Sequence, residues 1–181
     1  MLQRTISRID LWRYRKVAQF CFGSVLDMGC GQQGLRNALS PSINYVGCDI
    51  DGGMVRGSAI SLPFLDRTFD IVVLCEILEH LDAPGQAIRE AARVAKNRII
   101  ISVPNDYSLV RLARLALGRD VEIDDEHIVS YNAFNLRSML ARSNFVTQKE
   151  FSFPLRLQLL PEIPIQSRFG YWQFSIADRR N

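Results

Sequence analysis

The chain has 181 residues, of which 48% are hydrophobic and 23% charged, the size and composition of one globular domain with a buried core. A net charge of +3, from 22 basic and 19 acidic residues, disfavours a nucleic-acid-binding protein. No apolar run approaches the roughly 20 residues of a membrane span, and the four cysteines show neither C-x-x-C spacing nor a secreted pattern. We therefore expect a single domain over residues 1–181, located in the reducing cytoplasm.

Helical and strand patterns alternate along the first part of the chain. Residues 1–22 contain a helical pattern, with Ile9, Trp12 and Val17 on one side. Short β-branched or aromatic runs typical of strands buried on both faces follow at residues 24–28, 44–48, 69–75 and 98–103. Helical spacing occurs between them, at residues 34–40 and 84–95. This alternation predicts a layered α/β fold with a parallel sheet.

The end of the chain departs from this alternation. Residues 145–151 and 171–177 are the last two strand candidates, and the segment between them contains three prolines and no helical period. Without a crossover helix, these two strands should pair antiparallel. The apolar stretch 151–165 has three interpretations: a contact surface for an oligomer, a lipid-facing loop, or core.

A glycine-rich segment follows the first strand. Gly29, Gly31 and Gly34 come directly after it and lead into the predicted helix at residues 34–40, an arrangement that binds ligands at the carboxyl edge of open α/β sheets. The G-x-G-x-x-G spacing also matches a dinucleotide fingerprint. Asp27 precedes the glycines, and Asp49 ends the second strand, where a carboxylate can accept both hydroxyls of a ribose. These features fit either of two nucleoside cofactors.

Two further motifs distinguish between these cofactors. Residues 61–73 read SLPFLDRTFDIVV, and residues 74–81 read LCEILEHL. Together with the glycine segment, they resemble the class I S-adenosylmethionine-dependent methyltransferases, in particular the branch with an LPF...FD segment and an E-x-L-E-H-L motif. The resemblance is close over residues 24–105 and looser over residues 126–128 and 134–146. It implies a Rossmann-like, doubly wound sheet of about seven strands whose last strand is antiparallel, which agrees with the helix-free final connection.

The resemblance also implies S-adenosyl-L-methionine as the cofactor and assigns residues to its parts. Residues matching Asp27, Gly29, Cys30 and Gly31 hold the methionine portion of the cofactor in this family. In this family, the residue that matches Asp49 binds the ribose of the cofactor, and the residue that matches Ile50 packs on its adenine. Cys75 and Glu76 line the pocket, while Ser58, beside Ala59, stands where the family often has an acid next to the adenine.

The chain departs from the family between the second and third strands. Only about five residues separate Asp49 from Met54 and Val55, whereas a parallel crossover normally needs about a dozen or more. We therefore expect the helix between strands 2 and 3 to be missing, with an extended link and a short third strand in its place.

The chemistry of methyl transfer requires placement of a nucleophile and sometimes removal of a proton. His127 is the candidate general base, with a surface or capping histidine as the alternative, and His80 is interpreted as structural. Residues 106–130 combine an amphipathic helical pattern with five acids at residues 120–126. We interpret this segment as a substrate cover or lid with a solvated acidic loop, leave open a peripheral membrane contact, and expect no metal site.

The sequence therefore predicts methyl transfer from S-adenosylmethionine to a small-molecule acceptor, with an oxygen nucleophile favoured. Two alternatives stay open: a catalytically silent, cofactor-binding partner subunit, and an NAD-dependent oxidoreductase. The second is disfavoured because no hydride-transfer site is evident. The motif used to methylate base amino groups is also missing after the fourth strand, where Leu74 to Ile77 stand.

Overall fold

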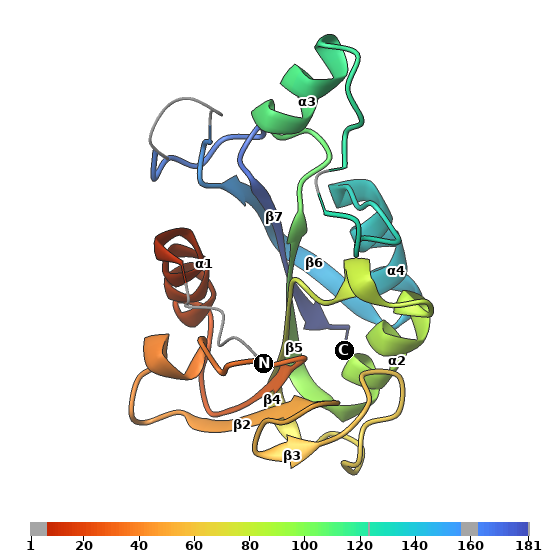
Figure 1. Cartoon of the computed structure of the whole chain (residues 1–181). Coiled ribbons are helices and arrows are strands. Elements are labelled where there is room, and N and C mark those ends of the chain that lie inside the picture. Colours follow the sequence, from red (N-terminus) through yellow and green to blue (C-terminus); the bar gives the residue numbers. More distant parts are fainter. Residues whose placement is uncertain (1–6, 123, 157–162, 181) are drawn as a thin grey trace.

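A single mixed sheet forms the centre of the protein (Figure 1). The computed structural model describes residues 7–122, 124–156 and 163–180, and within these ranges seven strands form the sheet. The strands are β1 (Ser24–Met28), β2 (Asn44–Asp49), β3 (Val55–Arg56), β4 (Phe69–Cys75), β5 (Ala95–Pro104), β6 (Phe145–Phe153) and β7 (Trp172–Arg179). Their order is β3-β2-β1-β4-β5-β7-β6, and β7 runs antiparallel to both of its neighbours. The predicted fold class is confirmed.

The strand order reverses between β1 and β4. The chain runs outward from β1 through β2 to β3 and then returns to place β4 on the other side of β1, parallel to it. In open α/β sheets, the connections leave the sheet in opposite directions at such a point, which opens a crevice at the carboxyl ends of the strands. The fold therefore predicts a binding site beyond Met28 and Cys75.

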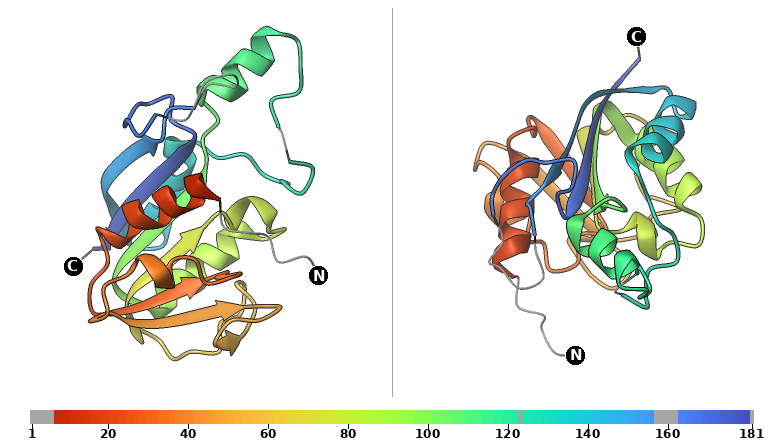
Figure 2. Two further views of the ribbon diagram at one scale, coloured as in Figure 1. Left: turned by 60° about the vertical axis from the view of Figure 1, so that its left-hand side comes forward. Right: turned by 90° about the horizontal axis from the view of Figure 1, so that it is seen from above.

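Helices cover both faces of the sheet, as Figures 1 and 2 show. The helical segments are α1 (Arg8–Ala18), α2 (Pro84–Val94), α3 (Leu109–Ala116), α4 (Ala133–Arg142) and two short 3-10 turns, η1 (Arg36–Ala38) and η2 (Leu78–His80). Because successive strand residues point to opposite faces, β1 contributes Val25 to the core beneath α1 and Leu26 to the core beneath α2 and α4. Strand β4 alternates in the same way. This two-sided burial explains why successive residues of these strands, such as residues 71–74, are apolar.

The predicted helix after the glycine segment is wrong. Residues 30–40 form turns and the single 3-10 turn η1 instead. Gln33 has a positive φ of 58°, which interrupts any helix at that point. A Cβ on Gly34 would overlap the ring of Tyr14, so α1 packs directly against this segment. The N-terminal helix, which falls within the predicted residues 1–22, takes over the covering of this face.

The connection between β2 and β3 contains no helix, as predicted. Met54 donates its N–H to the carbonyl of Gly47 at 2.8 Å, and the link returns at once to a strand of two residues paired with Cys48 and Asp49. The carboxyl end of β2 is therefore not covered by a crossover helix.

The predicted cover at residues 106–130 contains α3, which projects beyond the carboxyl edge of the sheet at the top of Figure 1. Of the predicted contact surface at residues 151–165, residues 157–162 lie outside the described part of the chain. Within the described residues, no helix combines the length and the apolar character that crossing a bilayer requires.

Candidate active site

A cavity of about 580 Å³ opens at the carboxyl ends of β1 and β4. Its walls come from α1, the glycine loop, the ends of β4 and β5, η2, and the segment after α3. The predicted site residues that line it are Gly29, Cys30, Gly31, Cys75, Glu76 and His127. The crevice expected from the strand order is thus present, and residues distant in sequence converge on it.

The glycine loop is held in place by the end of β2. The N–H groups of Gly29 and Cys30 both donate to the carbonyl of Cys48, at 2.8 and 3.2 Å. The carboxylate of Asp49 accepts from the N–H of Gly31 at 2.8 Å through Oδ2, and from the N–H of Asp51 at 3.1 Å through Oδ1. Asp49 therefore joins two adjacent strand ends.

Gly29 and Gly31 both have positive φ angles, of 73° and 45°, but their surroundings differ. A Cβ at Gly29 would overlap Ile77, whereas a Cβ at Gly31 would have no heavy atom within 4 Å. We expect Gly29→Ala to lower the free energy of unfolding by about 2 to 4 kcal/mol, from strain and overpacking, and Gly31→Ala by only about 1 kcal/mol. Urea denaturation of both variants would measure this, and equal losses would contradict the assigned contact with Ile77.

Asp27 lies below the glycine loop, almost fully buried and outside the cavity lining. Burial raises its pKa from 3.8 to about 6, although the hydroxyl of Tyr45 donates to its Oδ2 at 2.8 Å and opposes this shift. Burial also raises the pKa of the Cys30 and Cys75 thiols to about 12. At neutral pH both cysteines are therefore neutral thiols, not thiolate nucleophiles.

Four other predicted residues, Asp49, Ile50, Ser58 and Ala59, are not part of the cavity lining. Ile50 follows Asp49 with an exposed fraction of 60%, an unusually open position for an isoleucine beside a site. Ser58 and Ala59 are in the turn after β3, where Ser58 forms an isolated bridge with Ser61. The structure brings Ile50 next to the glycine-loop contact of Asp49, but it does not bring Ser58 or Ala59 to the cavity wall.

Arg13 is a site residue that sequence reasoning missed. Arg13 is one of several basic residues near the N-terminus, but it is 7% exposed and lines the cavity. Its Nη1 lies 3.6 Å from Oε2 of Glu76, and its guanidinium carbon is 4.8 Å from the centroid of the Trp172 ring. The positive φ of Glu76, 53°, turns the chain at the end of β4. No local signal distinguishes Arg13 from its exposed neighbours.

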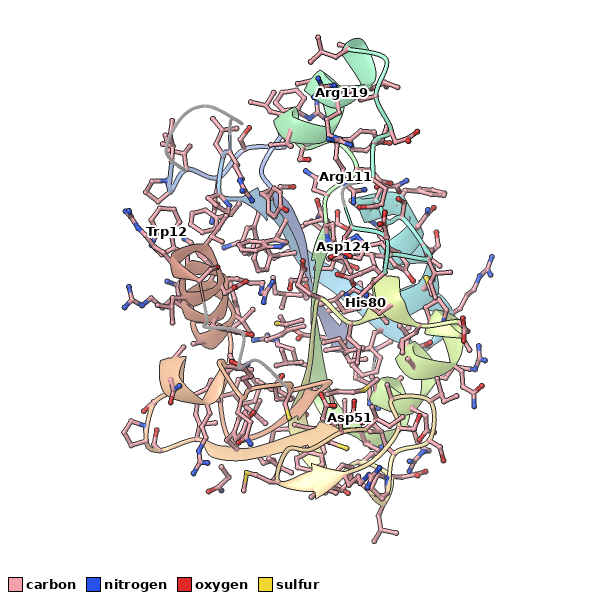
Figure 3. The ribbon with its side chains drawn as sticks, viewed as in Figure 1. Trp12, Asp51, His80, Arg111, Arg119 and Asp124 are labelled. Carbon is pink, nitrogen blue, oxygen red and sulfur yellow. The ribbon has the colours of Figure 1, made fainter. Side chains whose placement is uncertain are left out.

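His127 lines the cavity together with part of the acidic loop. Its Nδ1 is 2.9 Å from Oε1 of Glu122, and Glu122 also pairs with buried Arg111, whose Nη2 lies 2.7 Å from its Oε2. Part of the acidic loop is therefore held in ion pairs at the cavity, whereas the sequence predicted a solvated loop. Figure 3 shows Arg111, Asp124 and His80 one below another, and all three line the same cavity.

Glu79 is a second residue that the sequence did not single out. It is 1% exposed, and neither of its carboxylate oxygens has a hydrogen-bond partner among the described residues. Burial first, and then the charge of Glu76, raise its pKa to about 9. Its backbone carbonyl accepts the N–H of Ile128 at 2.8 Å, so Glu79 fixes the returning segment next to η2.

Comparison with known proteins gives matches in both sequence and fold. A family model described as "Methyltransferase domain" matches residues 26–101. The chain is 27% identical over 149 residues to the "Probable S-adenosylmethionine-dependent methyltransferase" of Mycolicibacterium smegmatis, covering 73% of this chain and 56% of that protein. The chain thus spans less than two thirds of this relative's length.

Solved structures match most of the chain. A SAM-dependent methyltransferase from Thermotoga maritima superimposes with a TM-score of 0.75 at 17% identity, covering 93% of this chain and 89% of that one. Magnesium protoporphyrin IX methyltransferase from Synechocystis, with bound SAH, superimposes with a TM-score of 0.63 at 16% identity, covering 94% and 85%. At these identities the likeness establishes the fold.

Proposed function

We propose that this chain is a class I S-adenosylmethionine-dependent methyltransferase, which binds S-adenosyl-L-methionine and transfers its methyl group to an oxygen of a small-molecule acceptor. The observation that carries the proposal is the position of Asp49. Its carboxylate is held by the N–H of Gly31 at the strand-order reversal, beside a cavity large enough for a small acceptor. A nucleoside bound by Asp49 would direct its other end along the glycine loop into that cavity.

The residues at this edge fit the parts of the cofactor. Each oxygen of Asp49 accepts one backbone N–H, which leaves acceptor capacity for two ribose hydroxyls. The exposed side chain of Ile50 offers an apolar surface for the adenine. Asp27 supplies negative charge below the loop for the ammonium group of the methionine portion. The open space at Gly31 lets a ligand approach its backbone.

Four more residues complete the proposed cofactor site. We propose Ser58, with Ala59, at the adenine edge, where the hydroxyl can hydrogen-bond an amino group. Cys75 and Glu76 would line the methionine end, at the carboxyl end of β4. In this position Glu76 would also orient Arg13 across the cavity.

The bound cofactor supplies an electrophilic methyl group on sulfur, so the protein has to position the acceptor oxygen in line and receive its proton. Nδ1 of His127 donates to Glu122, which leaves the Nε2 lone pair available to accept a proton. We propose that this nitrogen takes the hydroxyl proton as the oxygen–carbon bond forms. The sulfur of the bound cofactor would be the leaving group and would keep the electron pair of the carbon–sulfur bond.

Residues 106–130 would act as the cover of the acceptor. The support is that Arg111, Glu122, Asp124 and His127 all line the cavity from this segment. Arg111 is buried and ion-paired with Asp106 as well as Glu122, which gives the cover an internal anchor at the base of α3.

Calorimetry followed by a transfer assay tests this function. We expect S-adenosylhomocysteine, the demethylated product, to bind and NAD not to bind. With methyl-labelled S-adenosylmethionine, we expect label to move to hydroxyl compounds in a panel of phenols, hydroxy acids and amines.

Each other outcome identifies a different function. Binding of NAD alone would indicate the oxidoreductase and contradict the proposal. Binding of S-adenosylhomocysteine without transfer to any acceptor would favour the silent partner subunit. Transfer to amines only would correct the acceptor atom from oxygen to nitrogen.

A further inference from the structure

Three side chains with metal-ligating atoms meet at one end of the cavity. Glu79, His80 and His127 each place one ligand atom within 4.8 Å of the others. Glu79 and His80 belong to η2, whereas His127 comes from the segment after α3, and the two histidine rings are 4.8 Å apart between centroids. The hydrogen bond from Ile128 to the carbonyl of Glu79 joins the two segments. The cluster is therefore built by tertiary contacts.

Hydrogen bonds fix both histidines in the same tautomer. Nδ1 of His80 is 3.2 Å from the carbonyl oxygen of Glu126, which can only accept, so this nitrogen carries the proton. Nδ1 of His127 donates to the carboxylate of Glu122 at 2.9 Å in the same way. The lone pair of each ring is then on Nε2. Metal-bound histidines commonly show this pattern, in which the second nitrogen donates to a carbonyl or carboxylate.

Glu79 supplies an independent observation that points to a cation. A buried carboxylate normally has hydrogen-bond donors or a paired cation. Glu79 is 1% exposed, and both of its oxygens lack hydrogen-bond partners among the described residues. A metal ion at the histidine nitrogens would give these oxygens the partner that they otherwise lack.

The charges around the cluster leave a net attraction for a cation. Three arginines line the cavity, and two of them are each paired with two carboxylates: Arg13 with Asp10 and Glu76, and Arg111 with Asp106 and Glu122. The guanidinium of the third, Arg156, lies over the ring of Tyr171. A further carboxylate, that of Asp124, lies with Oδ2 3.8 Å from Nε2 of His127 and could join the same ion.

We propose that Glu79, His80 and His127 bind a divalent first-row transition-metal ion. Two imidazoles with one carboxylate suit zinc, iron or a similar ion, whereas calcium takes six to eight oxygens. Ligand atoms around such an ion stand about 3 to 3.5 Å apart at bond lengths of about 2.1 Å. The side chains therefore have to close by about 1 Å on binding.

A bound ion would change the role of His127 from proton acceptor to ligand. An acceptor hydroxyl that coordinates the ion would lose its proton to solvent, because a metal lowers the pKa of a bound hydroxyl. The acceptors would then be compounds with an oxygen able to ligate a metal. This consequence rests on the proposed function, whereas the metal site itself does not.

The chain contains only two histidines, so their nuclear magnetic resonance signals report on this cluster alone. The experiment uses the full chain without an affinity tag, labelled with ¹⁵N-histidine and titrated with Zn²⁺. We expect both rings to carry the proton on Nδ1 and both Nε2 signals to shift together, complete at one equivalent. Zinc that leaves either Nε2 signal unmoved, as it would if it bound only thiols, overturns the proposal.

Two variants test the carboxylate. Glu79→Gln should weaken zinc binding at least about tenfold, whereas Asp125→Asn, at an exposed acid in the segment that carries His127, should leave it unchanged. Equal affinity in the wild type and Glu79→Gln excludes Glu79 as a ligand. If Glu79→Gln does not fold, the wild-type spectra decide the question alone. Calorimetry with S-adenosylhomocysteine on the same wild-type sample separates the proposals, because a failure to bind it would remove the proposed function and leave the zinc result standing.

Discussion

Replacing Asp49 with alanine should weaken the binding of S-adenosylhomocysteine by about 30- to 150-fold. A carboxylate that accepts both ribose hydroxyls makes a bidentate, charge-assisted contact worth about 2 to 3 kcal/mol. Asp49 also accepts the N–H of Gly31, so the variant loses the bond that orders the glycine loop. Calorimetry would measure the affinity, and circular dichroism would establish that the fold is retained.

The adjacent acid provides a matched control. Asp51 is exposed and contributes its backbone N–H, not its carboxylate, to the Asp49 contact, so Asp51→Ala should bind the ligand as the wild type does. Asp49→Asn, which keeps one oxygen acceptor but loses the charge, should fall between the wild type and alanine. An unchanged affinity in a folded Asp49→Ala would remove Asp49 from the ribose site and require another group at the end of β2.

The parts of the fold that could be predicted are those determined by local sequence. Strands β4 and β5 contain the apolar runs at residues 71–75 and 99–101 because both faces of the sheet are covered. The absence of a helix between β2 and β3 follows from chain length alone, since the link after Asp49 is too short for one. The helix predicted at residues 34–40 is replaced by turns and η1, and the ring of Tyr14 from α1 packs on Gly34, a tertiary contact that the local sequence does not reveal.

The candidate site, like the fold, has residues that local sequence predicts and residues that depend on tertiary packing. Motifs around Asp49 and Glu76 place these residues at strand ends, and the structure brings the glycine loop, Cys75 and Glu76 to one cavity. The burial of Arg13 could not be predicted, because it depends on Glu76 and Trp172, which are far away in sequence. The partnerless carboxylate of Glu79 could not be predicted either, since it results from how η2 and the segment after α3 pack together.

Asp27→Asn should stabilise the protein at neutral pH while weakening the binding of S-adenosylhomocysteine. The pKa of Asp27 rises from 3.8 to about 6 because burial disfavours its charged form. The stabilising contribution of the protonated acid is therefore fully present below about pH 4 and is lost as the pH rises through about 6. At pH 8 the variant should gain about 2 to 3 kcal/mol in the free energy of unfolding, and the hydroxyl of Tyr45 can still donate to the amide oxygen.

Asp70 serves as the control, because the loss of its charge should change the free energy of unfolding in the opposite direction. The pKa of Asp70 is lowered, first by the N–H and then by the hydroxyl of Ser24, so its ionised form stabilises the folded state above about pH 4. Asp70→Asn should therefore destabilise the protein at pH 8. Urea denaturation at pH 8 and pH 4.5 would show the Asp27→Asn difference shrinking as the pH falls, whereas the Asp70→Asn difference should persist, because pH 4.5 is still above the ordinary pKa of 3.8 for Asp70. A loss of stability in Asp27→Asn at pH 8 would mean that Asp27 makes favourable contacts as an anion even without ligand, and its buried charge would then be structural.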